Sequence, residues 1–187
     1  MRPRSLTALA VAAALAAGCG TARKRTYTDG EMDFGSVRTV AVLPFTNLTR
    51  DNLAADRVRD VFANALLATG AVYVVPQGEV ARGAQQANLA SPSPTPDEVM
   101  KLGKLLKADA VIAGVVREYG EVKSGTSTGS LVSLTVQMFE TSTGKIVWSA
   151  ASTKGGVTVT ARLFGSSGPP LNAVTEAAVD DLLEKLF

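Results

Sequence analysis

The stretch that decides the fold lies at residues 37–76, VRTVAVLPFTNLTRDNLAADRVRDVFANALLATGAVYVVP. It opens at 37–45 with a β-branched apolar run closed by a proline and a phenylalanine, which predicts a buried strand. Apolar residues then recur every three or four positions within 52–69, the spacing of a helix with one apolar face, and Gly70 stands where such a helix ends. A second apolar run at 71–76 predicts another strand. Strands separated by helices favour a sheet with a parallel core.

The rest of the chain adds a well-defined helix start and an ending rich in strands. Thr95 suits the N-cap, Pro96 fits the first helical position and Glu98 completes a capping box, so we expect a helix from there to about residue 107. The other expected elements are a weak helix at 77–88, strands at 108–119, 131–140 and 145–153, and a final helix at 171–187. The expected fold class is α/β: a single domain whose mixed sheet combines parallel core strands with an antiparallel meander, flanked by helices.

The N-terminus carries the clearest functional signal. Two arginines precede an uncharged apolar run at 6–17, which has the length of a signal-peptide core and is shorter than the ~20 residues of a membrane-spanning helix. Small residues lead from this run to Cys19, which resembles the lipobox of bacterial lipoproteins, with Ala16 where that motif usually has leucine. We expect residues 1–18 to be a signal peptide and Cys19 to carry a lipid anchor. The alternatives are an uncleaved anchor helix and a secreted protein with an incidental cysteine.

The residues after the cysteine predict where the protein resides. Gly20, not aspartate, follows Cys19, which in Gram-negative bacteria resembles the pattern of lipoproteins sent to the outer membrane. We therefore expect a lipid-anchored protein on the periplasmic face of the outer membrane. Residues 19–36 are polar and lack apolar periodicity, so they predict a flexible tether, and residues 37–187 form the expected domain. A tether of about 17 residues spans ~20–25 Å on average.

Composition argues against an enzyme. The chain has no histidine and a single cysteine, which excludes Ser-His and Cys-His mechanisms. Residues 125–129, GTSTG, match G-x-S-x-G, but they lie between two expected strands, so we interpret them as a hairpin tip. Asp180, Asp181 and Glu184 are expected to form a solvated helix face in preference to a metal site. We expect no catalytic, cofactor-binding or metal-binding residue, and the near-neutral mature chain argues against nucleic-acid binding.

Two segments leave alternatives open. Arg117, Glu118 and Glu121 could form a ligand or partner surface, or pair with one another as ordinary surface charges. Residues 157–164, VTVTARLF, alternate between apolar and polar side chains. They could form an ordinary strand, or a mobile one that adds to the sheet of a partner or of another copy.

Several segments together resemble a known superfamily. VAVLPFTNLT at 40–49, VYVVP at 72–76, LLKADAVIAGVVREYG at 105–120 and TSTGKIVW at 141–148 are similar to the curli-assembly and TolB-N-terminal-like superfamily of bacterial lipoproteins. The resemblance covers about residues 37–187 and is nearest to small periplasmic lipoproteins of unknown function. The superfamily also includes the curli-secretion pore lipoprotein and the lipoprotein activator of penicillin-binding proteins.

The resemblance implies a non-catalytic accessory or interaction module of an envelope assembly or export complex, held to the membrane through Cys19 and bound to envelope proteins. One alternative is an activator of a peptidoglycan synthase, whose relatives reach through the cell wall on a long tether; the tether here is short. The other is self-association into a curli-pore-like oligomer. Against a pore, the chain lacks the segments of 9–11 alternating residues that a membrane-spanning strand needs.

Overall fold

The computed structural model describes residues 26–125, 127–157 and 168–187. Its strands are β1 (Thr26–Thr28), β2 (Thr39–Val42), β3 (Thr46–Asn47), β4 (Tyr73–Val74), β5 (Ala110–Ser124), β6 (Ser127–Glu140) and β7 (Ile146–Gly155). Its helices are the 3-10 turn η2 (Phe34–Ser36), α2 (Ala54–Ala68), α3 (Gln77–Ala87), α4 (Pro96–Leu106) and α6 (Leu171–Leu183). Among these described residues, no helix has the length and apolar character needed to cross a membrane.

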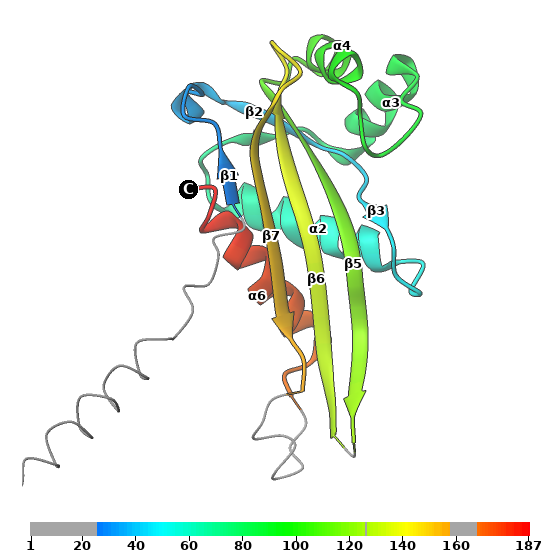
Figure 1. The fold of residues 1–187 in the computed structure, drawn as a ribbon. Helices are drawn as coiled ribbons and strands as arrows, with labels where there is room; N and C mark the ends of the chain where they lie inside the picture. The colour runs from blue at the N-terminus through cyan, green and yellow to red at the C-terminus, as the bar shows by residue number, and fades with distance from the viewer. Residues whose placement is uncertain (1–25, 126, 158–167) are drawn as a thin grey trace, which may run out of the picture.

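The strands form one seven-stranded mixed sheet, in the order β1-β7-β6-β5-β2-β4, with β3 also paired to β5 (Figure 1). β2, β3 and β4 pair in parallel, either with β5 or with each other, whereas β5, β6, β7 and β1 pair antiparallel. This arrangement confirms the predicted fold class, including the parallel core and the antiparallel meander.

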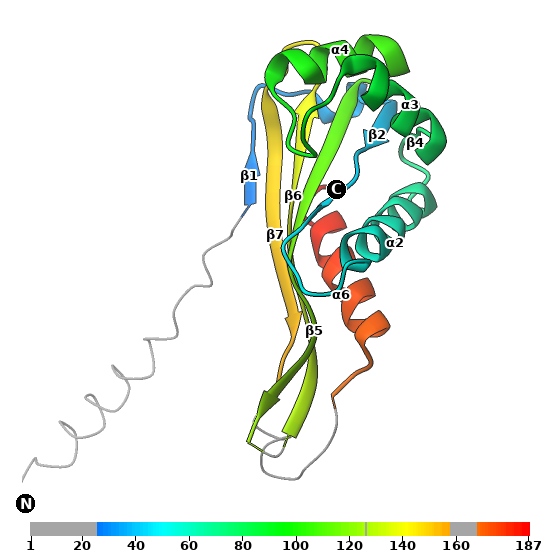
Figure 2. The same ribbon diagram turned by 90° about the vertical axis from the view of Figure 1, so that its right-hand side faces the viewer.

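Helices cover the two sides of the sheet unequally. α2 and α6 pack along one side and bury the larger core, which includes Phe62, Leu66, Leu134 and Trp148. α3 and α4 pack on the other side only at one end of the sheet, over a smaller core that includes Phe139. Figure 2 shows β5, β6 and β7 running well beyond α3 and α4, with α2 and α6 on one side only. Much of one sheet face therefore has no helix over it.

The predicted helix ends are confirmed by their hydrogen bonds. At the start of α4, the Thr95 backbone N–H donates to Glu98 Oε2 at 2.7 Å, and the Glu98 N–H donates to Thr95 Oγ1 at 3.4 Å, which completes the capping box. After α2, Gly70 takes a left-handed φ of +66°, a conformation that glycine adopts without steric cost.

The single strand predicted at 37–45 is divided in two. β2 ends at Val42, the Leu43 N–H still donates to Ile112 O at 2.8 Å, and pairing with β5 resumes only at Thr46 in β3. Pro44 lies between the two strands and has no N–H to donate, so the ladder is interrupted there.

The central hairpin is longer than the sequence predicts. β5 and β6 stay paired out to Ser124 and Ser127, so residues 121–124 and 127–130 are strand where we expected loop. This part of the hairpin projects past α2 and β3, and its polar residues have no apolar periodicity that would predict a strand. Backbone hydrogen bonds hold the two strands together there. The prediction of a hairpin tip at GTSTG is confirmed, with Gly125 in a left-handed conformation.

The predicted tether is wrong for residues 26–36. β1 pairs with β7 in the register Thr26↔Ala150 to Thr28↔Trp148, and Phe34 in η2 packs against the core. β1 is only three residues long and has no apolar periodicity, so its sequence does not predict a strand. Backbone pairing with β7 alone holds it in place. The signal peptide, Cys19 and the rest of residues 1–25 lie outside the described residues, as does most of the segment at 157–164.

Candidate partner-binding face

The uncovered part of the sheet is centred on β6 and β7. Side chains alternate along β6, so Leu134 and Val136 enter the core beneath α2 and α6, while Thr135 and Gln137 point to the other side. We call this other side the open face. It consists of Val115 and Glu118 on β5, Leu131, Ser133, Thr135 and Gln137 on β6, Ser149, Ala151 and Thr153 on β7, and Tyr27 on β1.

Cross-strand pairing arranges these side chains in rows. Thr135 pairs with Val115 on one side and with Ala151 on the other, which makes the central row. Ser133 lies opposite Thr153, and their hydroxyl oxygens are 2.9 Å apart. Both pairings show that these residues share one side of the sheet.

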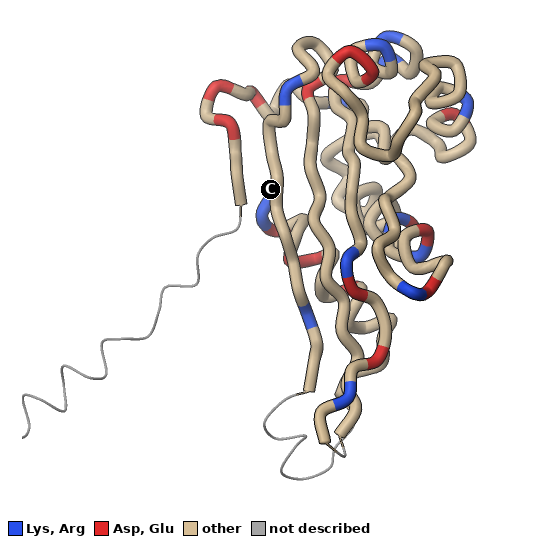
Figure 3. Tube along the Cα trace, turned by 45° about the vertical axis from the view of Figure 1, so that its right-hand side comes forward, with Lys and Arg blue, Asp and Glu red and all other residues tan. Residues whose placement is uncertain are grey.

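The part of the open face that lies on β6 and β7 carries no charge. β6 has no charged residue from Ser127 to Phe139, and β7 has none from Ile146 to Thr153. Figure 3 shows the resulting uncoloured run along the middle of both strands, with charges gathered at their ends. Lys154 on β7 points to the opposite side, because it pairs with Asp181 of α6. Interface cores are depleted of charged residues in the same way.

Several polar side chains on the open face have no hydrogen-bond partner among the described residues. The side chains of Thr135, Gln137 and Ser149 make no hydrogen bond with any other residue that the structure describes. Each is half-buried among its neighbours, and none of its polar side-chain atoms is among the fully buried atoms that lack a partner. The face can therefore donate and accept hydrogen bonds without first breaking internal ones.

Larger side chains stand at the two ends of the open face. Tyr27 lies at one end, beside Ser149, and is 52% exposed. Leu131 lies at the other end, with Gly120 and Gly155 as its cross-strand neighbours. The seven residues from Leu131 to Gln137 span roughly 20 Å along the strand.

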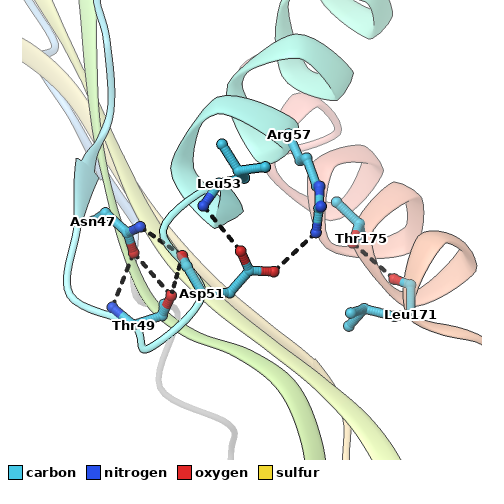
Figure 4. A network of polar contacts seen from close by, with 7 residues as sticks. All are labelled: Asn47, Thr49, Asp51, Leu53, Arg57, Leu171 and Thr175. Atoms are coloured by element: carbon cyan, nitrogen blue, oxygen red, sulfur yellow. Dashed lines mark hydrogen bonds and ion pairs between the residues drawn. The ribbon is translucent and has the colours of Figure 1, made fainter.

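A braced loop borders the open face on the β5 side (Figure 4). Asn47 Nδ2 donates to Asp51 O at 2.8 Å, the Thr49 N–H donates to Asn47 Oδ1 at 2.9 Å, and Arg57 pairs with Asp51 Oδ2 at 2.8 Å. This network holds Leu48 and Leu53 in solvent, 64% and 54% exposed. The loop attaches to the sheet through the Leu48 N–H, which donates to Val116 O at 2.9 Å.

The acidic residues of the last helix have a structural role. Asp181 accepts hydrogen bonds from Lys154 at 3.0 Å and from Lys185 at 2.5 Å, which ties α6 to β7, whereas Asp180 and Glu184 are exposed. Burial raises the pKa of Asp181, but the hydrogen bonds from Lys185 and Lys154 outweigh this effect and hold the pKa at about 2. A fully solvated face was therefore the wrong expectation for Asp181. The residues described contain no cluster of three or more potential metal ligands.

Arg117, Glu118 and Glu121 do not pair with one another. All three are exposed, and none makes an ion pair within the described part of the chain. The expectation of ordinary surface pairing is therefore wrong for these residues. Glu118 lies opposite Ser133 and so marks the charged border of the open face.

With the geometry in place, comparison with known proteins identifies the family. Residues 22–153 match the family model of the peptidoglycan-synthase activator LpoB. The chain belongs to the LpoB family. That is a family of activators, in agreement with the prediction of a non-enzymatic role. The match favours the alternative of a peptidoglycan-synthase activator. The sequence resemblance is instead nearest to small lipoproteins of unknown function.

Solved structures share the fold of this LpoB-family chain. The PelC dodecamer from Paraburkholderia phytofirmans is 20% identical, with a TM-score of 0.59, and the match covers 87% of this chain and 94% of that one. Lipoprotein GNA1162 from Neisseria meningitidis is 20% identical, with a TM-score of 0.55 and coverage of 79% and 99%. The protein CT253 from Chlamydia trachomatis is 16% identical, with a TM-score of 0.52 and coverage of 81% and 96%. At these identities the likeness concerns the fold alone. No protein with a curated description matches the chain in sequence.

Proposed function

We propose that this LpoB-family protein is a lipid-anchored activator of a peptidoglycan synthase, attached through Cys19 to the periplasmic face of the outer membrane. The observation that carries the proposal is the family match over residues 22–153. The lipobox-like sequence that ends at Cys19 supports the anchor, and Gly20 supports the outer membrane as its destination. In this role the protein binds an enzyme and changes its rate without taking part in the chemistry.

The length of the anchor segment limits where activation can occur. The described domain begins at Thr26, so only residues 19–25 separate it from the lipid. Seven residues span at most ~25 Å when fully extended. The activator is therefore confined near the membrane that holds it, and the synthase must extend a segment to meet it.

A reconstituted polymerisation assay tests the proposal. The lipidated full-length protein, purified in detergent, is mixed in turn with each peptidoglycan synthase of the same cell and a lipid-linked precursor. We expect the rate of glycan-strand synthesis by at least one synthase to rise several-fold, with half-maximal effect at the dissociation constant of the complex. Mass spectrometry of the same preparation should show the lipid on Cys19. A lipidated protein that neither binds nor stimulates any of these synthases would contradict the proposal.

Self-association is a second candidate, favoured by the sheet edges. In the described residues, β5 has no outer partner strand beyond Val116, and β7 has none beyond Ala150. Open edges can pair with another chain. Light scattering of the lipidated protein in detergent gives its mass, and a monomer at all concentrations would count against this candidate.

A further inference from the structure

The open face differs from the rest of the molecule in its low charge. Across the whole chain 19% of residues are charged, whereas on the open face Glu118, at the β5 border, is the only charged residue of ten. Solvent-facing strand positions normally carry charged residues, which help to prevent association. On β6 and β7 the face keeps only hydroxyl, amide and aliphatic groups, and such a surface is suited to contact with another molecule.

The chemistry of the face restricts what can cover it. Two sheets that pack face to face bury large apolar side chains, whereas this face offers mostly small polar ones. A second copy of the same face would bury little apolar surface. A charged partner would lose hydration over β6 and β7 and find no opposite charge there in return. The fitting partner is a protein surface that is itself uncharged and supplies hydrogen bonds to Thr135, Gln137 and Ser149.

The size of the face indicates a transient contact. Roughly 20 Å along the strands and 15 Å across them gives about 300 Å², below the ~800 Å² that each partner buries in a stable complex. A permanent dimer is not expected from so small an area. An enzyme and an activator that bind and separate can use a contact of this size.

We propose that the open face is the surface that docks on the peptidoglycan synthase, through an uncharged, hydrogen-bonding segment of that enzyme. This inference rests on the proposed function. Tyr27 supplies the anchoring aromatic side chain, because tyrosine is enriched among the residues that dominate binding energies. Tyr27 lies just after residues 19–25, which connect the domain to the lipid on Cys19. This end of the face therefore lies within ~25 Å of the anchoring membrane.

Matched pairs of variants test the docking surface. Ala151→Lys places a charge in the middle of the open face, and Ala177→Lys places the same charge on the exposed side of α6. Tyr27→Ala removes the aromatic group from the open face, and Tyr73→Ala removes a similarly exposed tyrosine from β4 at the far edge of the sheet. Each lipidated variant is titrated against the synthase that the wild-type protein binds. Thermal unfolding shows whether each variant is folded.

We expect Ala151→Lys and Tyr27→Ala to raise the dissociation constant at least 10-fold, and the two controls to change it less than 2-fold. Because Glu118 at the border is the only charged residue of the face, raising NaCl from 50 to 500 mM should change the wild-type constant less than about 3-fold. Unchanged binding by folded Ala151→Lys and Tyr27→Ala would overturn the docking surface and leave the activator function intact. A wild-type protein that binds no synthase would overturn both.

Discussion

Along β6, neighbouring residues belong to two surfaces of opposite character. Leu134 is 1% exposed and lies in the core beneath α2 and α6, whereas Thr135, the next residue, stands half-buried on a face that no helix covers. The covered side is large and apolar, and its work is to hold the fold together. The open side is small, polar and uncharged along β6 and β7, and it contributes little to folding. A strand that alternates in this way separates stability from recognition, so the two can be altered independently.

The largest difference should appear when these neighbours are truncated in turn. Leu134→Ala leaves a cavity in the core and should lower the free energy of unfolding by about 2–5 kcal/mol. Thr135→Ala removes a hydroxyl that has no partner among the described residues and should change it by less than about 0.5 kcal/mol. Urea unfolding followed by circular dichroism measures both. A similar loss in the two variants would show that the open face is part of the folding core.

The end of the sheet that α4 covers should respond to overpacking. A Cβ added to Gly103 on α4 would lie 2.3 Å from Thr141 Cβ, so Gly103→Ala should cost about 1–3 kcal/mol. Gly78→Ala on α3 meets no atom within 4 Å and should be neutral or slightly stabilising. Thermal melts of the two variants make the comparison, and a stable Gly103→Ala protein would show that α4 packs less closely than described.

The ion pairs of Asp181 give the covered side a pH dependence. Because the folded-state pKa of about 2 lies below the ordinary value of 3.8, Asp181 stabilises the fold above about pH 4, and this stability is lost as the pH falls toward 2. Asp181→Asn should therefore cost about 1–2 kcal/mol at pH 7 and progressively less below pH 4. Asp180→Asn, on the same helix but exposed, is the control. An Asp181→Asn deficit that stays constant between pH 7 and pH 2 would contradict this assignment.

The smallest expected effect concerns the start of α4. Thr95→Ala removes the hydroxyl that accepts the Glu98 N–H and should cost about 1 kcal/mol. Only the covered end of the sheet should loosen, so hydrogen exchange should quicken in α4 and stay unchanged in the middle of β6 and β7. Faster exchange throughout the sheet would mean that α4 stabilises the open face as well.

The same comparison explains what the sequence could and could not predict. Elements with a buried side have a periodic pattern, so α2, α4, the central strands and the capping box at Thr95 were all predictable. β1 and the end of the long hairpin were missed, because backbone pairing holds them and their side chains carry no pattern. The open face left a signal that went unused. The alternation of Ser133, Thr135 and Gln137 is typical of a strand with one polar side, and the absence of charge from that side of β6 is the feature that marks it as a binding surface.

Site-specific photo-crosslinking in living cells tests the central claim most directly. A photoreactive amino acid is placed at position 135 in the middle of the open face, or at position 177 on the exposed side of α6, and adducts are identified by mass spectrometry. The account predicts an adduct with a peptidoglycan synthase from position 135 and none from position 177. A synthase adduct from position 177 alone would contradict it, because the enzyme would then dock on the helical side of the molecule.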